Sequence, residues 1–397
     1  MSLRGKVAVV GVAEADLGEV GPGFTPLDLI GQATLRALED SGLDKSDVDG
    51  LFSASAYYHM PTLSVGEYLG IRPRYSDATS MGGSSFVSHL LHATAAIDAG
   101  LCEVALITYG STQRSGGGRL VTGSETDPYE APYNPRYPIS MYALAASRHM
   151  HEYGTTREQL AEVAVAAREW AKLNPKAFMR EDLTVEDVLS SRMVSSPLSV
   201  RDCCLVTDGG GAAIVTSAER ARDLEVTPVY LLGAGEAHWH RSIGQMPDLT
   251  VSAAVESGTR AYAMAGVGPE DVDVAMLYDA FTISTVLFLE DLGFCEKGEG
   301  GAFVSGGRIS PGGELAVNTS GGGLSYNHPG MYGLLLIVEA VRQLRRESGD
   351  RQVENPNIAL VHGNGGVLSS QVTALLGSES ALNGATQGMK STNSRED

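Results

Sequence analysis

The chain has 397 residues, of which 43% are hydrophobic and 19% charged, so it can bury a large core. Its net charge of −19 argues against a nucleic-acid surface and against attraction to anionic membranes. The four cysteines lack CxxC or zinc-like spacing, and no apolar run approaches the roughly 18 residues of a membrane span. We therefore expect a soluble, cytoplasmic α/β protein with reduced thiols and no metal site.

Strands and helices alternate along the first hundred residues. A β-branched run at 6–18 predicts a buried strand, and 25–43 carries apolar residues at helical spacing behind a Thr-Pro start, which favours a helix. Further strands are expected within 47–55 and 103–111. The helix expected at 84–100 is apolar over most of its circumference, which indicates a position between layers.

The later chain repeats part of this pattern. The stretches 34–52 and 259–277 share a helix, a glycine and an acidic turn that contains Asp-Val-Asp. Further on, "EVALITYG" resembles "NIALVHGNGG" in the same order along the chain. Such an internal repeat predicts two related α/β halves joined near 220–230.

This organisation divides the chain into parts. We expect a first half over 1–225, a second half over 226–378 and a disordered polar tail over 379–397. Residues 111–200 interrupt the first half with a Gly-, Pro- and Tyr-rich stretch and an amphipathic helix. We interpret them as an inserted loop-and-helix subdomain, because long insertions in compact domains commonly form lids or binding loops.

A glycine pair and several serines precede the buried helix, in "SDATSMGGSSFVSHLLHA" (76–93). A helix start presents free N–H groups and the positive end of the helix dipole, which favours a site for a negative oxygen. Ser80, Ser84 and Ser85 are candidate nucleophiles, and no cysteine lies nearby.

Two other pairs of residues have mainly structural interpretations. His89 and His92 could hold a metal, but no third ligand is near, so buried hydrogen-bonded roles are favoured. Cys203 and Cys204 precede a Gly-rich strand and indicate packing rather than redox chemistry.

The second half offers three candidate polar side chains. His328 in "NHPG" is expected at a helix start with Asn327 as cap, where a neutral imidazole either donates to an oxyanion or only caps. His362 ends a strand as a base or a structural histidine, and the turn around Gly365 could hold an oxyanion. Tyr278 in "LYDAFT" packs in the core unless a strongly perturbed pKa makes it a base.

Together these features resemble the thiolase superfamily, most closely the sterol-carrier-protein-type thiolases and the bacterial acetyl-CoA acetyltransferase or non-specific lipid-transfer proteins. The resemblance extends to about Gly377 and is carried by "YDAFT", "LEDLGFCEKGEGGAFV", "GGELAVNTSGGGLS", "EAVRQLRRESGDRQV" and "ALVHGNGG". It implies a thiolase fold, in which duplicated βαβαβ halves form a five-layered αβαβα core with an inserted loop subdomain. It also implies a homodimer.

The chain departs from the family at its nucleophile. In the family a cysteine at the start of the buried helix attacks the thioester, and here the matching residue is Ser80, close to Gly82. His362 replaces the family's second cysteine, Tyr278 stands in place of the usual Asn or His, and His328 is retained. A serine hydroxyl needs an adjacent base, whereas a thiolate does not, so the change argues against an acyl-enzyme.

One branch of the superfamily, the steroid side-chain-cleaving aldolases, resembles a thiolase without this cysteine and carries a tyrosine in "LYD". The likeness implies retro-aldol cleavage of a β-hydroxyacyl-CoA, with Tyr278 or His362 taking the hydroxyl proton. His328 and backbone N–H groups of the glycine loops would hold the enolate oxygen. A small zinc-ribbon/OB-fold partner is also implied. Coenzyme A is then part of the substrate, and no bound cofactor is expected.

Two alternatives stay open. The chain could be an ordinary acyltransferase with Ser80 or another group as nucleophile, or a non-catalytic acyl-CoA- or lipid-binding subunit. Arg114, Arg119 and Lys172 in the insert are candidate CoA-binding residues.

Overall fold

Within residues 2–117 and 128–384, which the computed structural model describes, ten strands form one continuous sheet. The first half contributes β1 (Val7–Glu14), β2 (Gly50–Ser53), β3 (Tyr75–Asp77), β4 (Val104–Ser111) and β7 (Gly209–Ser217). The second half contributes β8 (Val229–His238), β9 (Val274–Leu277), β10 (Ala316–Val317), β11 (Ile358–Gly365) and β12 (Ser370–Gly377).

The strand order repeats between the halves. It runs β3-β2-β4-β7-β1 in the first half and β10-β9-β11-β12-β8 in the second, so equivalent strands occupy equivalent places. The two sets join where β1 and β8 pair antiparallel over a short stretch. The duplication predicted from the sequence is therefore confirmed as two halves related by an approximate twofold arrangement.

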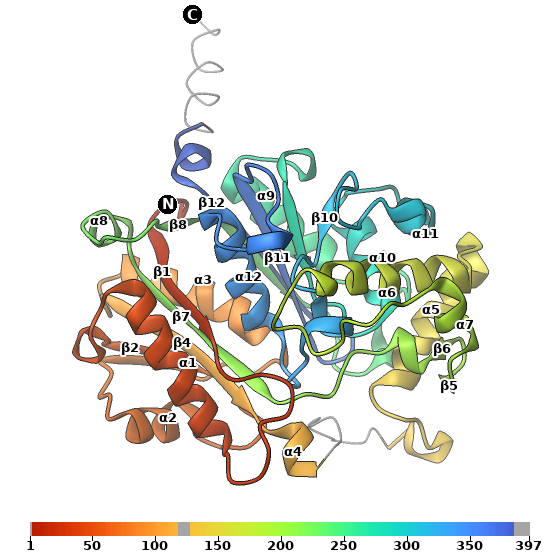
Figure 1. The fold of residues 1–397 in the computed structure, drawn as a ribbon, viewed down its shortest axis with the longest axis horizontal. Coiled ribbons are helices and arrows are strands. Elements are labelled where there is room, and N and C mark those ends of the chain that lie inside the picture. Colours follow the sequence, from red (N-terminus) through yellow and green to blue (C-terminus); the bar gives the residue numbers. More distant parts are fainter. Residues whose placement is uncertain (1, 118–127, 385–397) are drawn as a thin grey trace, which may run out of the picture.

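Helices cover and separate the two sets of strands (Figure 1). On the outside, α1 (Pro26–Ser41) packs on β1, β4 and β7, and α9 (Ala254–Ala265) packs on β8 and β12. By contrast, α3 (Ser85–Asp98) and α12 (Gly333–Arg345) each contact strands of both halves. These contacts place α3 and α12 in a central layer, which confirms the five-layered arrangement and explains why α3 is apolar almost all round.

The short helices α2 (Pro61–Leu69), α4 (Gln113–Gly117) and α8 (Ala218–Ala221) lie in the connections of the first half. Thr25 caps α1 as expected, since its side chain accepts from the Asp28 N–H. No helix in the described part of the chain is long and apolar enough to cross a membrane.

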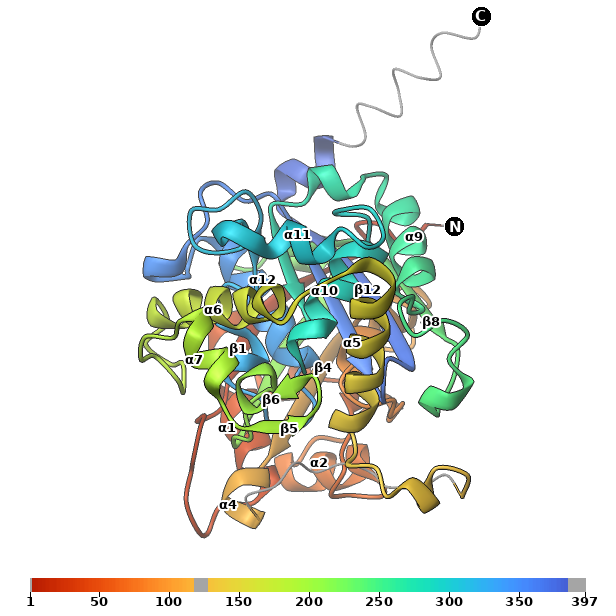
Figure 2. The same ribbon diagram turned by 90° about the vertical axis from the view of Figure 1, so that its right-hand side faces the viewer.

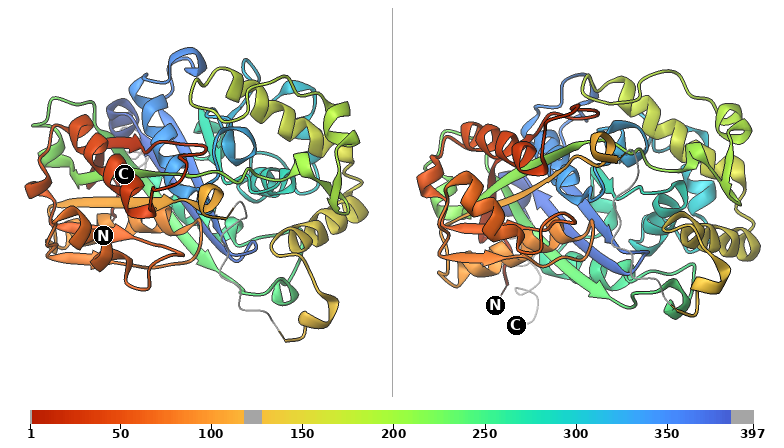
Figure 3. Two further views of the ribbon diagram at one scale, coloured as in Figure 1. Left: turned by 60° about the horizontal axis from the view of Figure 1, so that its bottom comes forward. Right: turned by 90° about the horizontal axis from the view of Figure 1, so that it is seen from below.

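The insert forms a separate group of elements beside the second half. It comprises α5 (Ile139–Tyr153), α6 (Arg157–Lys172), α7 (Val185–Ser190) and a hairpin of β5 (Met193–Ser195) and β6 (Leu198–Ser199). Figure 2 shows these elements on one face, and in the right panel of Figure 3, seen from below, they lie on the opposite side of the molecule from the first half. α6 packs on α10 (Thr282–Asp291) and α11 (Gly300–Val304).

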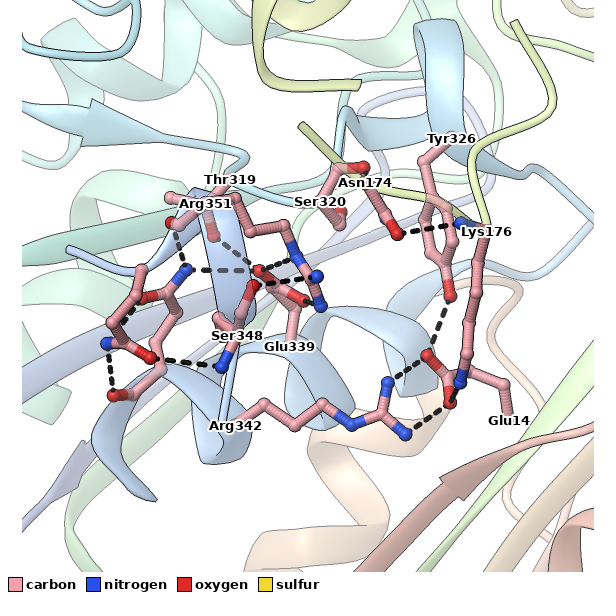
Figure 4. Close-up of polar contacts among 12 residues, drawn as sticks. Glu14, Asn174, Lys176, Thr319, Ser320, Tyr326, Glu339, Arg342, Ser348 and Arg351 are labelled. Atoms are coloured by element: carbon pink, nitrogen blue, oxygen red, sulfur yellow. Dashed lines mark hydrogen bonds and ion pairs between the residues drawn. The ribbon is translucent and has the colours of Figure 1, made fainter. Parts of the chain in front are cut away.

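A buried ionic network ties the insert to the core (Figure 4). The carboxylate of Glu14 on β1 contacts the Arg342 guanidinium of α12, lies 3.0 Å from Lys176 Nζ and accepts from the Tyr326 hydroxyl at 3.0 Å. Burial alone raises the pKa of Glu14, but the charges of Arg342 and Lys176 outweigh it and hold that pKa at about 2. The carboxylate is therefore ionised and fully paired.

The expected tail begins with structure. Residues 379–384 are helical, and the backbone carbonyls of Ala381 and Leu382 accept hydrogen bonds from the Arg4 side chain. The remainder of the tail, 385–397, lies outside the described residues.

Candidate active site

A cavity of about 650 Å³ lies where both halves and the insert meet. Its wall is formed by the turn before α3, the end of β9, the turn between β11 and β12, the segment after β8 and the start of α5. Its polar and glycine wall residues include Ser80, Gly82, Gly83, Tyr142, Cys204, His238, Tyr278, His328, Asn364, Gly365, Gly366 and Ser370. A cavity of this size suits a small-molecule ligand.

The two glycine-rich turns predicted from the sequence meet in this wall. A Cβ built on Gly82 would lie 3.0 Å from the Gly366 nitrogen and 3.2 Å from Gly365 Cα. A Cβ on Gly83 would lie only 2.1 Å from the Tyr278 ring. The glycines are therefore required for close approach: they bring the turn before α3 against the β11–β12 turn and against the tyrosine.

Tyr278 and His328 form a pair at the cavity. The Tyr278 hydroxyl oxygen lies 3.0 Å from His328 Nε2 and accepts from the Tyr332 N–H at 3.1 Å. The carbonyl of Gly330, at 3.2 Å, is a second acceptor for its proton. Tyr278 is 4% exposed and His328 3% exposed, so the pair is shielded from bulk water.

Burial keeps both members of the pair neutral at rest. It raises the pKa of Tyr278 well above its ordinary value and lowers the pKa of His328 to about 4. In the tautomer that leaves His328 Nε2 unprotonated, the phenol donates to this nitrogen, which is the arrangement required for passing a proton to the imidazole.

His328 lies before the helix, not at its start as predicted from the sequence. α12 begins only at Gly333, because the chain turns at Gly330, whose φ is +97°. The pKa of His328 is thus lowered by burial rather than by a helix dipole. Its Nε2 faces Tyr278 rather than an open oxyanion position, and its Nδ1 has no hydrogen-bond partner among the described residues.

The backbone of His328 is fixed from three sides. Its N–H donates to Thr207 Oγ1 at 2.8 Å, and its carbonyl accepts from Gln113 Nε2 at 2.6 Å. The preceding turn is held by Asp279, whose carboxylate accepts from the Gly323 N–H at 2.6 Å. Burial raises the pKa of Asp279 to about 7. Asp279, which follows Tyr278 directly in the sequence, therefore fixes the turn that precedes His328.

Two of the predicted site residues do not reach the cavity. The His362 ring is fully buried in the sheet, with Nδ1 2.9 Å from Thr373 Oγ1 and Nε2 2.9 Å from Gln371 Oε1. Both nitrogens are occupied, and burial lowers the pKa of His362 to about 3. Asn327 is also buried outside the cavity wall. The predictions of His362 as a proton acceptor and of Asn327 as a substrate contact are therefore wrong, because neither side chain borders the space for substrate.

The candidate nucleophiles at the cavity differ in their exposure and in their hydrogen-bond partners. Ser80 lines the cavity but is exposed, and among the described residues no cysteine stands at the start of α3. Cys204 does line the cavity, but burial raises the pKa of its thiol well above the ordinary value. Ser370 is placed better than Ser80, because its Oγ lies 3.0 Å from His238 Nδ1 and 2.7 Å from Ser84 Oγ.

Sequence reasoning missed several wall residues, above all Tyr142, Asn364, His238 and Ser370. They come from α5, β11, β8 and β12, and no local motif links them. Asn364 could have been predicted from its position two residues after His362 in a strand, because side chains at this spacing lie on the same face of a sheet.

The basic residues of the insert that were candidates for binding CoA do not line the cavity where the structure describes them. Arg114 Nε pairs with Glu19 at 2.8 Å and Lys172 Nζ pairs with Asp182 at 2.8 Å, and neither residue lines the cavity. Arg119 lies outside the described residues. Arg241, after β8, is a basic residue of the wall.

The two helical histidines have the structural roles that were favoured. His89 Nε2 lies 3.0 Å from the Thr79 carbonyl oxygen, and His92 Nδ1 lies 2.6 Å from Asp77. Hydrogen bonds to Asp77 and Glu236 raise the pKa of His92 to about 9, so it is a paired cation. No metal-binding group of three His, Cys, Asp or Glu side chains occurs within 2–117 and 128–384.

Comparison with known proteins agrees with this fold. Residues 235–378 match the family model described as thiolase C-terminal domain-like. The acetyl-CoA acetyltransferase of Methanothermobacter thermautotrophicus is 36% identical over 91% of this chain and 96% of its own length. The steroid side-chain-cleaving aldolase of Thermomonospora curvata is 34% identical over 91% of this chain and 96% of its own length.

A solved structure described as the Ltp2-ChsH2(DUF35) aldolase superposes with a TM-score of 0.87 at 33% identity, covering 95% of this chain and 99% of that one. The duplicated, five-layered α/β architecture agrees with these matches. The chain belongs to the thiolase superfamily.

Proposed function

We propose that this chain is a carbon–carbon lyase that acts on CoA thioesters by retro-aldol cleavage of a β-hydroxyacyl-CoA. The products would be an aldehyde or ketone and a shorter acyl-CoA. The observation that carries this proposal is the 3.0 Å contact between the Tyr278 hydroxyl and His328 Nε2 in a cavity where no cysteine precedes α3. Similarity to aldolases over nearly the whole chain supports it.

The pair can take a proton without forming a free phenolate, which burial disfavours. The β-hydroxyl proton of the substrate passes to the Tyr278 oxygen as the phenol's own proton passes to His328 Nε2. The β-carbon oxygen becomes a carbonyl as the Cα–Cβ bond breaks, and that electron pair enters the thioester as an enolate. The proton held on the imidazole returns through Tyr278 to the α-carbon, which releases the shorter acyl-CoA.

The enolate oxygen needs hydrogen-bond donors placed before the reaction. The turn before α3, including Gly82 and Gly83, and the turn around Gly365 and Gly366 place backbone at the cavity wall close to Tyr278. One such donor is worth about 3 kcal/mol in the transition state. Ser80 would bind substrate through its backbone rather than attack it. Coenzyme A enters as part of the substrate, and the proposed steps require no bound cofactor.

The assembly belongs to the proposal as well. We propose a cytoplasmic homodimer that works with a small zinc-ribbon/OB-fold partner protein. Support for the partner comes from the similar aldolase structure, whose description names a DUF35 component.

A second candidate is acyl transfer, favoured by one observation. The Ser370 hydroxyl lies 3.0 Å from His238 Nδ1, whose Nε2 lies 3.9 Å from Glu236, so a serine with an adjacent base does border the cavity. This arrangement would form an acyl-enzyme, which the retro-aldol route does not.

The test is product analysis with a panel of β-hydroxyacyl-CoAs, with and without a candidate small zinc-ribbon/OB-fold partner protein. Wild-type chain should yield a shorter acyl-CoA and a carbonyl compound, and Tyr278→Phe should yield neither. Tyr262→Phe is the matched control, because Tyr262 lies on the outer helix α9 and its hydroxyl donates to the carbonyl of Leu292, just after α10. Covalent acylation of Ser370 would favour acyl transfer, and binding without turnover would favour a non-catalytic subunit.

A further inference from the structure

A row of buried polar side chains ends at the cavity and takes no part in the steps proposed so far. Asn364 Nδ2 donates to the Tyr142 hydroxyl oxygen at 2.7 Å, and Asn364 Oδ1 accepts from Gln371 Nε2 at 2.9 Å. Behind them, His362 Nε2 lies 2.9 Å from Gln371 Oε1, and His362 Nδ1 lies 2.9 Å from Thr373 Oγ1. Tyr142 and Asn364 line the cavity, whereas the other three residues lie behind the wall.

The donors in this row all point the same way. Because Gln371 Oε1 can only accept, His362 Nε2 must carry the proton, and its Nδ1 must then accept from the Thr373 hydroxyl. Gln371 donates to Asn364, and Asn364 donates to Tyr142. The row thus ends at the Tyr142 hydroxyl oxygen, which accepts a hydrogen bond from the Asn364 amide.

The phenol hydrogen is left without a good internal acceptor. Within the described parts of the chain, it reaches the Gly366 carbonyl at 3.4 Å, which is long beside the ~2.7–2.8 Å typical of O–H···O bonds. The ring itself cannot swing away, since Tyr142 is 1% exposed and stacks on Phe281 with centroids 4.4 Å apart. The hydroxyl is consequently fixed in place with its hydrogen available to an oxygen in the cavity.

We propose that Tyr142 is a second catalytic phenol, which donates a hydrogen bond to the thioester oxygen of the acyl-CoA and to the enolate formed from it. Asn364, Gln371 and His362 are positioning residues that keep this hydroxyl in its donor orientation. The inference rests on the proposed function and deepens it, because it assigns the enolate a side-chain donor contributed by the insert.

Of the four tyrosines that line the cavity, Tyr278 and Tyr142 are suited to different tasks. Tyr278 faces an imidazole that can take its proton, whereas Tyr142 faces an amide donor. Burial raises the pKa of Tyr142 to about 12, so it keeps its proton and remains a donor throughout. One phenol relays a proton and the other stabilises negative charge.

The kinetic test compares Tyr142→Phe with Asn364→Asp. A carboxylate at 364 would accept the Tyr142 hydrogen and draw it out of the cavity, so both variants should lower kcat by about 100-fold with little change in KM. Because they remove the same hydrogen bond, the double variant should lose no more than either alone. A loss below about threefold in Tyr142→Phe would overturn the proposal.

A binding measurement separates this inference from the proposed function. The probe is acetyl-CoA labelled with ¹³C at the thioester carbonyl, observed by infrared difference spectroscopy on the full chain. Wild type and Tyr262→Phe should shift the carbonyl band to lower frequency, and Tyr142→Phe and Asn364→Asp should return it toward the free value. If the probe binds to Tyr142→Phe and its carbonyl band stays at the wild-type frequency, the role of Tyr142 is refuted and the proposed function is not. A wild-type chain that neither binds this probe nor cleaves any β-hydroxyacyl-CoA refutes the proposed function, and this inference with it.

Discussion

Two buried polar regions of this molecule are built on opposite principles. In the network around Glu14 and Glu339, each carboxylate is paired with a cation: Arg342 and Lys176 contact Glu14, and Arg351 lies 2.9 Å from Glu339 (Figure 4). At the cavity, Tyr278, His328 and Tyr142 are neutral groups held by neighbours that leave a proton free to move or to donate.

The difference separates structure from chemistry. A fully paired network satisfies its charges internally and holds β1, α12 and the insert together, but it has nothing left to offer a ligand. The cavity, of about 650 Å³, is bordered by a hydrogen-bond donor without a close internal acceptor, the Tyr142 hydroxyl. Variants in the two regions should therefore affect different quantities.

The largest effect is expected for Tyr278→Phe. Removing the hydroxyl abolishes the proton relay, so kcat/KM for β-hydroxyacyl-CoA cleavage should fall by about 10³-fold. The free energy of unfolding should fall by only about 1–3 kcal/mol, because the ring still packs against Gly83 while the buried Tyr332 N–H loses its acceptor. Steady-state kinetics and a melting curve on the same sample check both parts, and a large drop in melting temperature would mean that the tyrosine belongs with the structural network.

Arg342→Met should have the converse result. It leaves Glu14 buried with one of its two cations removed, and breaking a buried pair costs about 3–5 kcal/mol of unfolding free energy. Activity per folded molecule should be unchanged. Denaturant unfolding with activity corrected for folded fraction measures this, with Arg74→Met, an exposed partner of Asp49, as the matched control.

The pH dependence sharpens the contrast further. His328 must be neutral to accept a proton, so kcat/KM should decline as pH falls toward its pKa of about 4. Since the unfolded histidine titrates near 6.5, the folded state also loses stability as pH falls from about 6.5 to 4. Glu14, with its pKa lowered to about 2, contributes stability above pH 4.5 that is lost as pH falls from about 4.5 toward 2.

These two acid effects can be told apart by substitution. Glu14→Gln should reduce the stability loss below pH 4.5, to which the lowered pKa values of Glu236 and Asp77 also contribute, and leave the pH profile of kcat/KM where it is. His328→Gln should lower kcat/KM by about 10²-fold and flatten the acid limb of that profile. An acid limb that persists in His328→Gln would assign the titration to another group.

The smallest effect is expected for His362→Asn. This change shortens the row behind Tyr142 without touching the cavity, so kcat should fall by only about three- to tenfold. KM should stay constant, since the loss is in transition-state stabilisation. A loss as large as that of Tyr278→Phe would restore His362 to the chemistry and contradict the structure.

The sequence was informative where periodicity or repetition governs the fold. The apolar circumference of α3 predicted a central helix, and the Asp-Val-Asp turns at 47–49 and 271–273 revealed the duplication. The sequence also singled out Tyr278 in "LYDAFT" and His328 in "NHPG", and both residues line the cavity.

The rest of the site depends on where space lies, which no local pattern records. Strand alternation places His362 and Asn364 on one face, but only the packing shows that the cavity reaches Asn364 and stops before His362. Tyr142 comes from the insert, so its meeting with Asn364 is a long-range contact. The environment of His328 was misjudged because Gly330 turns the chain before the helix starts.

The central claim is tested most directly by the products and the protein mass after one turnover. Wild-type chain mixed with a β-hydroxyacyl-CoA should release a shorter acyl-CoA and an equal amount of carbonyl compound while its intact mass stays unchanged, and Tyr278→Phe should release neither. An acylated chain, or undiminished cleavage by Tyr278→Phe, would contradict the account.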